Sequence, residues 1–240
     1  MSDIDIQELL EAACEFQGLS MQSRNQASEK YRKEETDEHH FIRIVIDGLI
    51  VRLAHNMKEK VKDTNEKISY QVSLSASYLR THFIINDMIL HSDLVEANTL
   101  LRKQLECLTR LHELDSKPLQ KLTRKTPNVI NTFRKMGKET YPHLSEIAHF
   151  ASPNAGELLH ILEQEGDLVG PSMMPVYTKA AHACFELQAL VSFYFLFWFI
   201  GKQRIFYETF DGKAEERLLI AAFETALEAG VIRIDVGEKT

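Results

Sequence analysis

The sequence predicts an all-α fold, a helical bundle around one central, aromatic-rich helix, and three observations support this. The 240 residues include only 10 Gly and 6 Pro, so turns are few and the elements between them are long. Apolar residues recur at spacings of three and four along most of the chain. A composition of 44% hydrophobic and 26% charged residues with 3 Cys excludes collagenous, disulfide-built and wholly disordered chains. We expect a single domain over residues 1–240.

The N-terminal part of the chain predicts two helices joined by a polar connector. Residues 4–16 predict an amphipathic helix docked on the bundle, with an apolar stripe formed by Ile6, Leu9, Leu10, Ala13 and Phe16. Residues 19–38 are polar and form either an exposed helix or a mobile connector. Residues 39–56 contain Asp47-Gly48, a hairpin signal, although their apolar residues recur at helical spacing. We favour a helix because isolated hairpins are rarely stable in a helical chain.

Two long helices follow, at about residues 70–90 and 94–114, and the short connection makes them antiparallel neighbours. A shorter helix is expected at 142–150, beginning near Pro142 because Pro suits a first helical turn. Another is expected at 155–164, followed by a loop over 166–175 that contains two Gly and two Pro.

The C-terminal part predicts helices at about 176–203 and 214–229. The first carries six aromatic residues that cover every side of it, namely Phe193, Tyr194, Phe195, Phe197, Trp198 and Phe199. Such a helix is either surrounded by other helices, which we favour, or forms a surface for a homodimer or a protein partner. No membrane span is expected, because the uninterrupted apolar run 189–200 is shorter than the roughly 20 residues that a span needs. Residues 231–236 alternate as a short C-terminal strand or part of a hairpin does.

The start of the sequence and its cysteines favour a cytoplasmic protein. The first twenty residues have neither a basic region nor a continuous apolar run, so no secretory signal is expected. Cys14, Cys107 and Cys184 lie far apart without a C-x-x-C pair, which predicts reduced, mostly buried thiols.

One segment, residues 116–138, is strongly basic and contains no acidic residue. Its seven cations are Lys117, Lys121, Arg124, Lys125, Arg134, Lys135 and Lys138. Because the whole chain carries −7, the rest of it carries −14. The segment is either a solvated face that balances this acidity or a contact surface for a polyanion such as RNA.

The motifs of nucleotide-binding, P-loop, α/β-hydrolase and zincin sites do not occur, and no cofactor is expected. A metal-type E-x-x-H pattern occurs twice, as Glu146 with His149 and as Glu157 with His160. The two pairs are only 11 residues apart, whereas ligand helices that converge in a bundle are separated by much more chain. We therefore expect no metal, and keep a helical-bundle metalloprotein as an alternative.

Two polar lines with a spacing of four residues form the candidate ligand site. One consists of Tyr141, Ser145 and His149, and the other of Asn98, Arg102 and Glu106. They are either exposed ion-pair ladders or face one another across a helix interface as a polar network or small pocket. His82 lies on an apolar face and is expected to be a hydrogen-bonded core residue.

The stretch Ala97–Leu114, with Arg102-x-x-x-Glu106, and the stretch Tyr141–Asn154, with Y-x-x-L-S and His149, resemble uncharacterised bacterial helical proteins of the HEPN-like class. The resemblance covers about residues 70–160. It implies a helical fold. Many such proteins are ribonucleases of toxin–antitoxin or defence systems, and they use an Arg that is followed after four to six residues by a His. Within residues 70–160 no Arg precedes His at this spacing, and Lys138 with His143 is the nearest match. Lysine lacks the planar fork that holds phosphate bidentately.

The sequence thus predicts a non-catalytic, HEPN-like module that binds a partner or ligand. The alternative is an RNA-cleaving enzyme with a degenerate motif, in which His149, His143 and Lys138 are the catalytic candidates.

Overall fold

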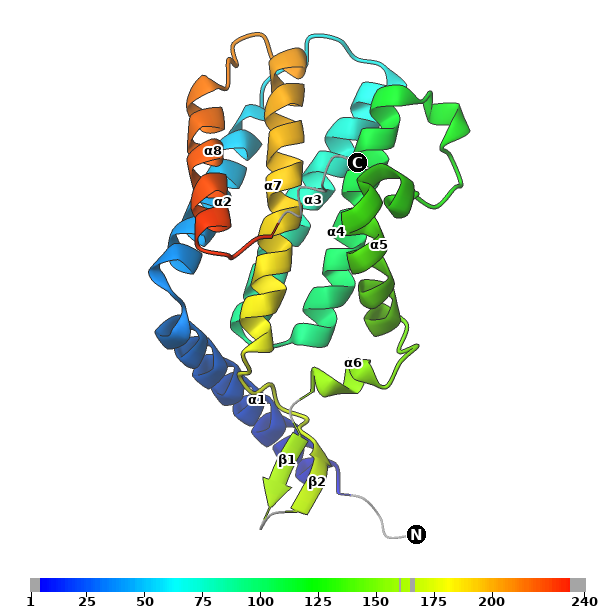
Figure 1. The fold of residues 1–240 in the computed structure, drawn as a ribbon. Coiled ribbons are helices and arrows are strands. Elements are labelled where there is room, and N and C mark those ends of the chain that lie inside the picture. The colour runs from blue at the N-terminus through cyan, green and yellow to red at the C-terminus, as the bar shows by residue number, and fades with distance from the viewer. Residues whose placement is uncertain (1–4, 160, 165–166, 234–240) are drawn as a thin grey trace.

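The computed structural model describes residues 5–159, 161–164 and 167–233, and shows the expected helical bundle (Figure 1). One continuous apolar core joins its long helices. In chain order the elements are α1 (Ile6–Glu34), α2 (Asp37–Asn56), α3 (Glu66–Leu90), α4 (Leu94–Ser116), the 3-10 turn η1 (Leu119–Lys121), α5 (Val129–Ala148), α6 (Asn154–Glu157), β1 (Ile161–Gln164), β2 (Asp167–Pro171), α7 (Ala180–Phe206) and α8 (Lys213–Glu228).

Side-chain caps explain where the first three helices begin. Asp5, Thr36 and Asn65 each accept a hydrogen bond from a backbone N–H in the first turn, at 2.9, 3.2 and 3.0 Å. These bonds satisfy donors that have no partner within the helix. Residues 39–56 belong to α2, so the helical interpretation of this segment is confirmed and Asp47-Gly48 lies inside a helix.

The aromatic helix α7 is the centre of the bundle, packed by α2, α3, α4 and α8 (Figure 1). Phe193, Phe195 and Phe199 are fully buried, and the Phe195 ring stacks on Tyr78 of α3 with centroids 3.7 Å apart. Only two large apolar side chains of α7 are exposed, Phe197 and Ile205. By length and composition α7 could cross a membrane, alone among the described helices, but 67% of its most apolar window is buried inside the bundle. The core helices of soluble proteins show the same combination.

Helix α5 differs from the sequence prediction. It begins at Val129 rather than near Pro142, which lies in its interior. It consists of two helical pieces, because Arg134 has φ 43° and ψ −108°. The pieces approach closely at Gly137, where a Cβ would lie 2.8 Å from the Val129 carbonyl oxygen. Pro142 was misinterpreted as a start signal, because a proline can also lie inside a helix at the cost of one backbone hydrogen bond.

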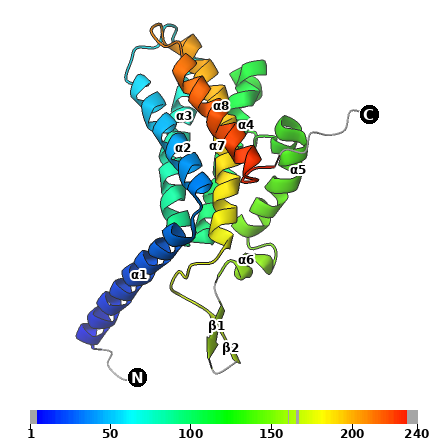
Figure 2. The same cartoon turned by 60° about the vertical axis from the view of Figure 1, so that its left-hand side comes forward.

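Helix α1 also differs from the prediction. Residues 19–34, expected as an exposed helix or a connector, continue the first helix without a break. The helix is docked only by its C-terminal half, where Tyr31 is buried and Arg24 forms ion pairs with Asp87 (3.0 Å) and Asp93 (2.5 Å). The N-terminal half, expected to be docked, extends away from the bundle (Figure 2).

The other differences lie in the link from α5 to α7 and at the C-terminus. The expected helix 155–164 ends at Glu157, and in place of helix and loop residues 161–164 and 167–171 form the antiparallel strands β1 and β2. Of the expected C-terminal strand, Val231 and Ile232 are buried but lie in a bend, and residues 234–236 lie outside the described part.

The three cysteines differ in exposure. Cys14 is exposed, against expectation, because it lies on the projecting half of α1. Cys107 is half-buried and Cys184 is buried, and burial raises the pKa of each thiol to about 12.

Candidate functional site

The basic segment 116–138 spans the end of α4, the turn η1 and the first part of α5. All seven cations predicted from the sequence are solvent-exposed. Lys117 lies 3.5 Å from Glu113, and Lys135 lies 3.9 Å from Glu139. The cations therefore extend from the C-terminal end of α4, over η1 and the loop, into the first part of α5 (Figure 1).

A buried ion pair on α4 holds this segment in place. Arg110 and Glu113 are nearly inaccessible to solvent and lie 3.3 Å apart. The Arg110 guanidinium donates to the carbonyl oxygens of Leu122, at 2.9 Å, and Lys125. The Glu113 carboxylate accepts from the backbone N–H of Asn128 at 3.4 Å. Because buried charges are costly unless paired and hydrogen-bonded, these contacts fix the backbone that carries the cations. The sequence analysis missed this pair; the i, i+3 spacing of Arg and Glu was its only signal.

Two hollows in the basic segment combine cations with aromatic rings. One, of about 420 Å³, is lined by Tyr70 of α3 together with Arg124, Lys125 and Glu66. The other, of about 520 Å³, is lined by residues of α5 and α7, including Arg134, Lys135, Phe133 and Tyr194, and also by Glu139. The rings of Phe133 and Tyr194 meet edge to face with centroids 5.6 Å apart. Each hollow offers an aromatic ring beside positive charge.

The two polar lines meet between α4 and α5. Arg102 donates to His149 Nε2 at 2.6 Å and to the Tyr141 hydroxyl at 3.3 Å, and lies 3.1 Å from the Glu106 carboxylate. The Tyr141 hydroxyl in turn donates to Glu106 Oε1 at 2.7 Å. Because a guanidinium can only donate, the imidazole nitrogen facing it is the acceptor. We call these four residues the polar network. It raises the pKa of Arg102, chiefly through the hydrogen bond to Tyr141.

The other two residues of the polar lines do not join the network. Asn98 is buried and donates to the Leu94 carbonyl oxygen of its own helix at 2.7 Å. The side chain of Ser145 has no hydrogen bond within the described residues. The arrangement is a set of hydrogen bonds near the surface rather than a pocket, and in it Arg102 Nε is buried without a hydrogen-bond partner among the described residues.

His82 belongs to a buried network, as expected for a core histidine. Its Nε2 lies 2.7 Å from Asp47 Oδ1, and its Nδ1 lies 3.3 Å from Ser192 Oγ. The three residue types are those of a hydrolase triad. Ser192 is completely buried, however, so no substrate reaches its hydroxyl, and the constellation is structural.

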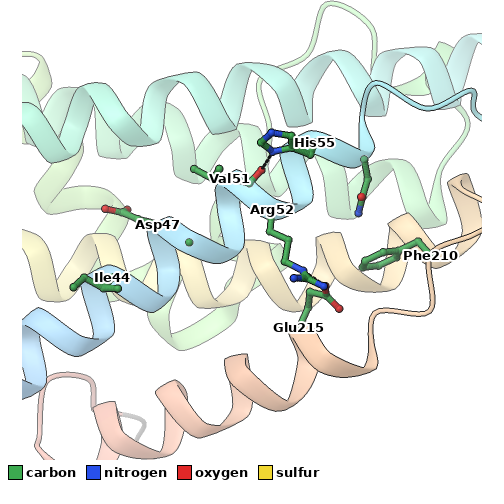
Figure 3. A pocket seen from close by; sticks show the side chains of 9 residues that line it. Ile44, Asp47, Val51, Arg52, His55, Phe210 and Glu215 are labelled. Atoms are coloured by element: carbon green, nitrogen blue, oxygen red, sulfur yellow. Dashed lines mark hydrogen bonds and ion pairs between the residues drawn. The ribbon is translucent and has the colours of Figure 1, made fainter.

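One cavity, of about 740 Å³, is an open groove between α2 and the start of α8 (Figure 3). Its polar side chains already have partners within the chain. Arg52 is paired with the buried Glu215, Asp47 with His82, and His55 Nδ1 lies 2.8 Å from the Val51 carbonyl oxygen. The groove therefore presents no convergent unpaired polar groups, which a specific ligand site requires.

The metal and catalytic candidates are not brought together. Glu146 and His143 are exposed, and His149 is engaged with Arg102. The side chain of Glu157 and all of His160 lie outside the described residues. Within the described residues, no three His, Cys, Asp or Glu side chains lie close enough to hold a metal ion. Lys138 is exposed on α5.

An Arg–His pair with six residues between, Arg32 and His39, occurs outside residues 70–160 and was missed. Arg32 is exposed at the end of α1, whereas His39 lies 3.3 Å from Glu186 of α7 and 2.9 Å from Thr36. The His39 imidazole is thus committed to joining α2 to α7.

The chain was compared with known protein families, curated proteins and solved structures, and matches none of them.

Proposed function

We propose that this chain is a non-catalytic, HEPN-like binding module of the cytoplasm that contacts single-stranded RNA through the basic segment 116–138. The observation that carries the proposal is the set of seven exposed cations, without an intervening acid, on a backbone held by Arg110 and Glu113. A backbone fixed in this way presents its charges without a large ordering cost on binding.

The aromatic hollows favour single-stranded nucleic acid over other polyanions. Proteins that bind single strands combine a positive groove, which follows the phosphates, with rings on which bases stack. Tyr70 is 38% exposed beside Arg124 and Lys125, so its ring is accessible to a base. If the cations served only to balance the negative charge of the rest of the chain, they would not need aromatic rings beside them.

The proposal is tested by titrating the protein with a fluorescent single-stranded RNA at several salt concentrations. The variant replaces Lys121, Arg124, Lys125 and Lys135 by Gln. We expect affinity to fall at least tenfold at low salt. The slope of log K against log salt should become shallower by about 3, since each lost phosphate contact contributes about 0.7 for single strands.

A matched control replaces four exposed cations elsewhere, Arg32, Lys33, Lys213 and Arg217, by Gln. It changes the net charge by the same amount. Equal binding by the two variants contradicts the proposal, because the effect then follows net charge and not the segment. Tyr70→Ala completes the design: loss of stacking should weaken binding by about 1–3 kcal/mol with the salt slope unchanged.

A second candidate function, RNA cleavage, is favoured by one observation, the 2.6 Å contact between Arg102 and His149 at an exposed site. An imidazole beside a cation is a combination that phosphodiester cleavage uses. Incubation of labelled RNA with the protein and with His149→Ala separates the two functions. Cleavage by the unmodified chain alone supports the enzyme. Equal cleavage by both excludes His149, and no cleavage by either supports the binding module.

A further inference from the structure

The projecting half of α1 has an apolar face that nothing in the described chain covers. Every residue from 5 to 19 is exposed, and Ile6, Leu9 and Leu10 keep 74%, 56% and 57% of their surface accessible. Phe16 and Leu19 keep 45% and 48%. A soluble surface rarely leaves so many adjacent large apolar side chains in water unless they form an interface.

The exposed face continues the face by which α1 docks on the bundle. Counting along the helix in steps of three and four leads from Ile6 through Ala13 and Ser20 to Ala27 and Tyr31. Ala27 and Tyr31 are buried against the bundle. The helix is therefore patterned for packing along its whole length, although the bundle covers only its second half (Figure 2).

The charges of α1 leave the edges of this face neutral. Glu8, Glu11 and Glu15 lie on the opposite side of the helix, at steps of three and four from one another. Beside the apolar stripe lie the uncharged residues Gln7, Ala12, Cys14 and Gly18, and at its end the charged N-cap Asp5. Two such faces can meet antiparallel without opposing like charges, because the two Asp5 residues then lie at opposite ends. An anionic lipid surface would instead be repelled, since helices that lie on membranes carry Lys and Arg on their polar side.

From these observations we infer that the face of α1 formed by Ile6, Leu9, Leu10, Ala13 and Phe16 pairs with the same face of a second copy of this chain. Its exposed apolar side chains offer on the order of 600 Å² per copy, near the roughly 800 Å² per partner of a stable interface. Pairing of identical faces closes a twofold dimer.

The first test measures the mass of the protein in solution by light scattering or sedimentation equilibrium. The protein concentration ranges over about 1–100 μM, which covers the dissociation constants of ordinary protein dimers. The unmodified chain should have twice its mass of 27.6 kDa. The double variant Leu9→Glu with Phe16→Glu should weaken the dimer about 100-fold or more and yield the monomer. Each dimer would otherwise bury the two new carboxylates of each copy in an apolar interface. Their exposure in the single chain keeps the variant folded, which circular dichroism checks.

The control, Gln22→Glu with Gln26→Glu, adds the same charge to the outer side of the same helix and should leave the dimer intact. A monomeric unmodified chain at 100 μM overturns the inference. It is overturned as well if the variant stays dimeric, or if the control dissociates equally.

A second measurement locates the interface. Cys14 is the exposed one of the three thiols and accepts a spin label. The apolar face from Ile6 to Phe16 is about 15 Å long, so any pairing within it, parallel or antiparallel, places the two Cys14 residues within about 30 Å. A longer interchain distance in the dimer shows that another surface pairs and overturns the inference.

Discussion

Helix α4 carries two Arg–Glu pairs, which differ in exposure and in what they bind. The side chains of Arg110 and Glu113 are 6% and 8% exposed, whereas those of Arg102 and Glu106 keep 19% and 25%. The buried pair bonds to backbone groups of the loop that follows the helix. The half-exposed pair bonds to side chains of α5, Tyr141 and His149.

The difference shows which of the two pairs can take part in function. The buried pair bonds mainly to backbone groups, which it cannot exchange without moving the chain, so its main role is to shape the basic segment; Arg110 also lines the hollow beside Tyr70. The polar network has side chains at the surface, where a ligand can replace one partner by another at small cost. The first pair therefore acts on binding mainly through structure, and the second is more open to direct contact.

The largest expected effect is that of Arg110→Met. It removes the buried cation beside the Glu113 carboxylate, leaving the exposed Lys117 at 3.5 Å, and removes the bonds to the carbonyl oxygens of Leu122 and Lys125. We expect the free energy of unfolding, measured by urea denaturation, to fall by about 3–5 kcal/mol. Arg110→Met with Glu113→Leu should recover much of this loss. If Arg110→Met lowers the free energy of unfolding no more than Arg102→Met does, the proposed difference between the buried and the half-exposed pair is wrong.

Arg102→Met and Tyr141→Phe should each cost about 1 kcal/mol, because both residues are partly hydrated and their partners can turn to water. The double variant should cost less than the sum, since Arg102 and Tyr141 share Glu106 as a partner. Urea denaturation of the four proteins in this cycle measures the coupling. Strict additivity would show that the polar network does not act as a unit.

The bundle could be predicted from the sequence where a helix is amphipathic and its ends are marked. The segments 70–90 and 94–114 agree with α3 and α4 to within a few residues, because apolar spacing and the short link determine them. The pattern of α1 was equally clear, but periodicity shows only that a face is apolar and not what covers it. The start of α5 at Val129 was missed because Pro142 resembles a start signal although it lies in the helix interior, and the strands β1 and β2 were missed because helical periodicity contains no information on strand pairing.

For the site, spacing put Arg102 and Glu106 on one polar line and Tyr141 and His149 on another, and left open whether the lines face one another; the structure brings these four side chains together. The buried pair escaped because Arg110 and Glu113 resemble an ordinary surface pair until the loop 117–128 folds over them. Burial arises from contacts far along the chain, which single-sequence periodicity does not contain. The network around His82 was partly foreseen, since a polar residue on an apolar face must find partners.

The smallest expected effect concerns pH and His112, which lies next to Glu113 on α4. Burial lowers the pKa of His112, a direction that nearby Lys202 reinforces and Asp115 opposes. Below the ordinary pKa of about 6.5, the unfolded chain binds a proton that the folded chain does not. Stability should therefore be constant above this pH and decrease as the pH falls below it.

His112→Gln should make that decrease shallower without abolishing it, because burial also lowers the pKa of His182. Urea denaturation between pH 7 and 5 measures the slope, with His55→Gln, an exposed residue of α2, as the control. If the free energy of unfolding decreases with falling pH as steeply in His112→Gln as in His55→Gln, the surroundings of the buried pair stay hydrated. Arg110 and Glu113 would then differ from Arg102 and Glu106 in their partners and not in their exposure to water.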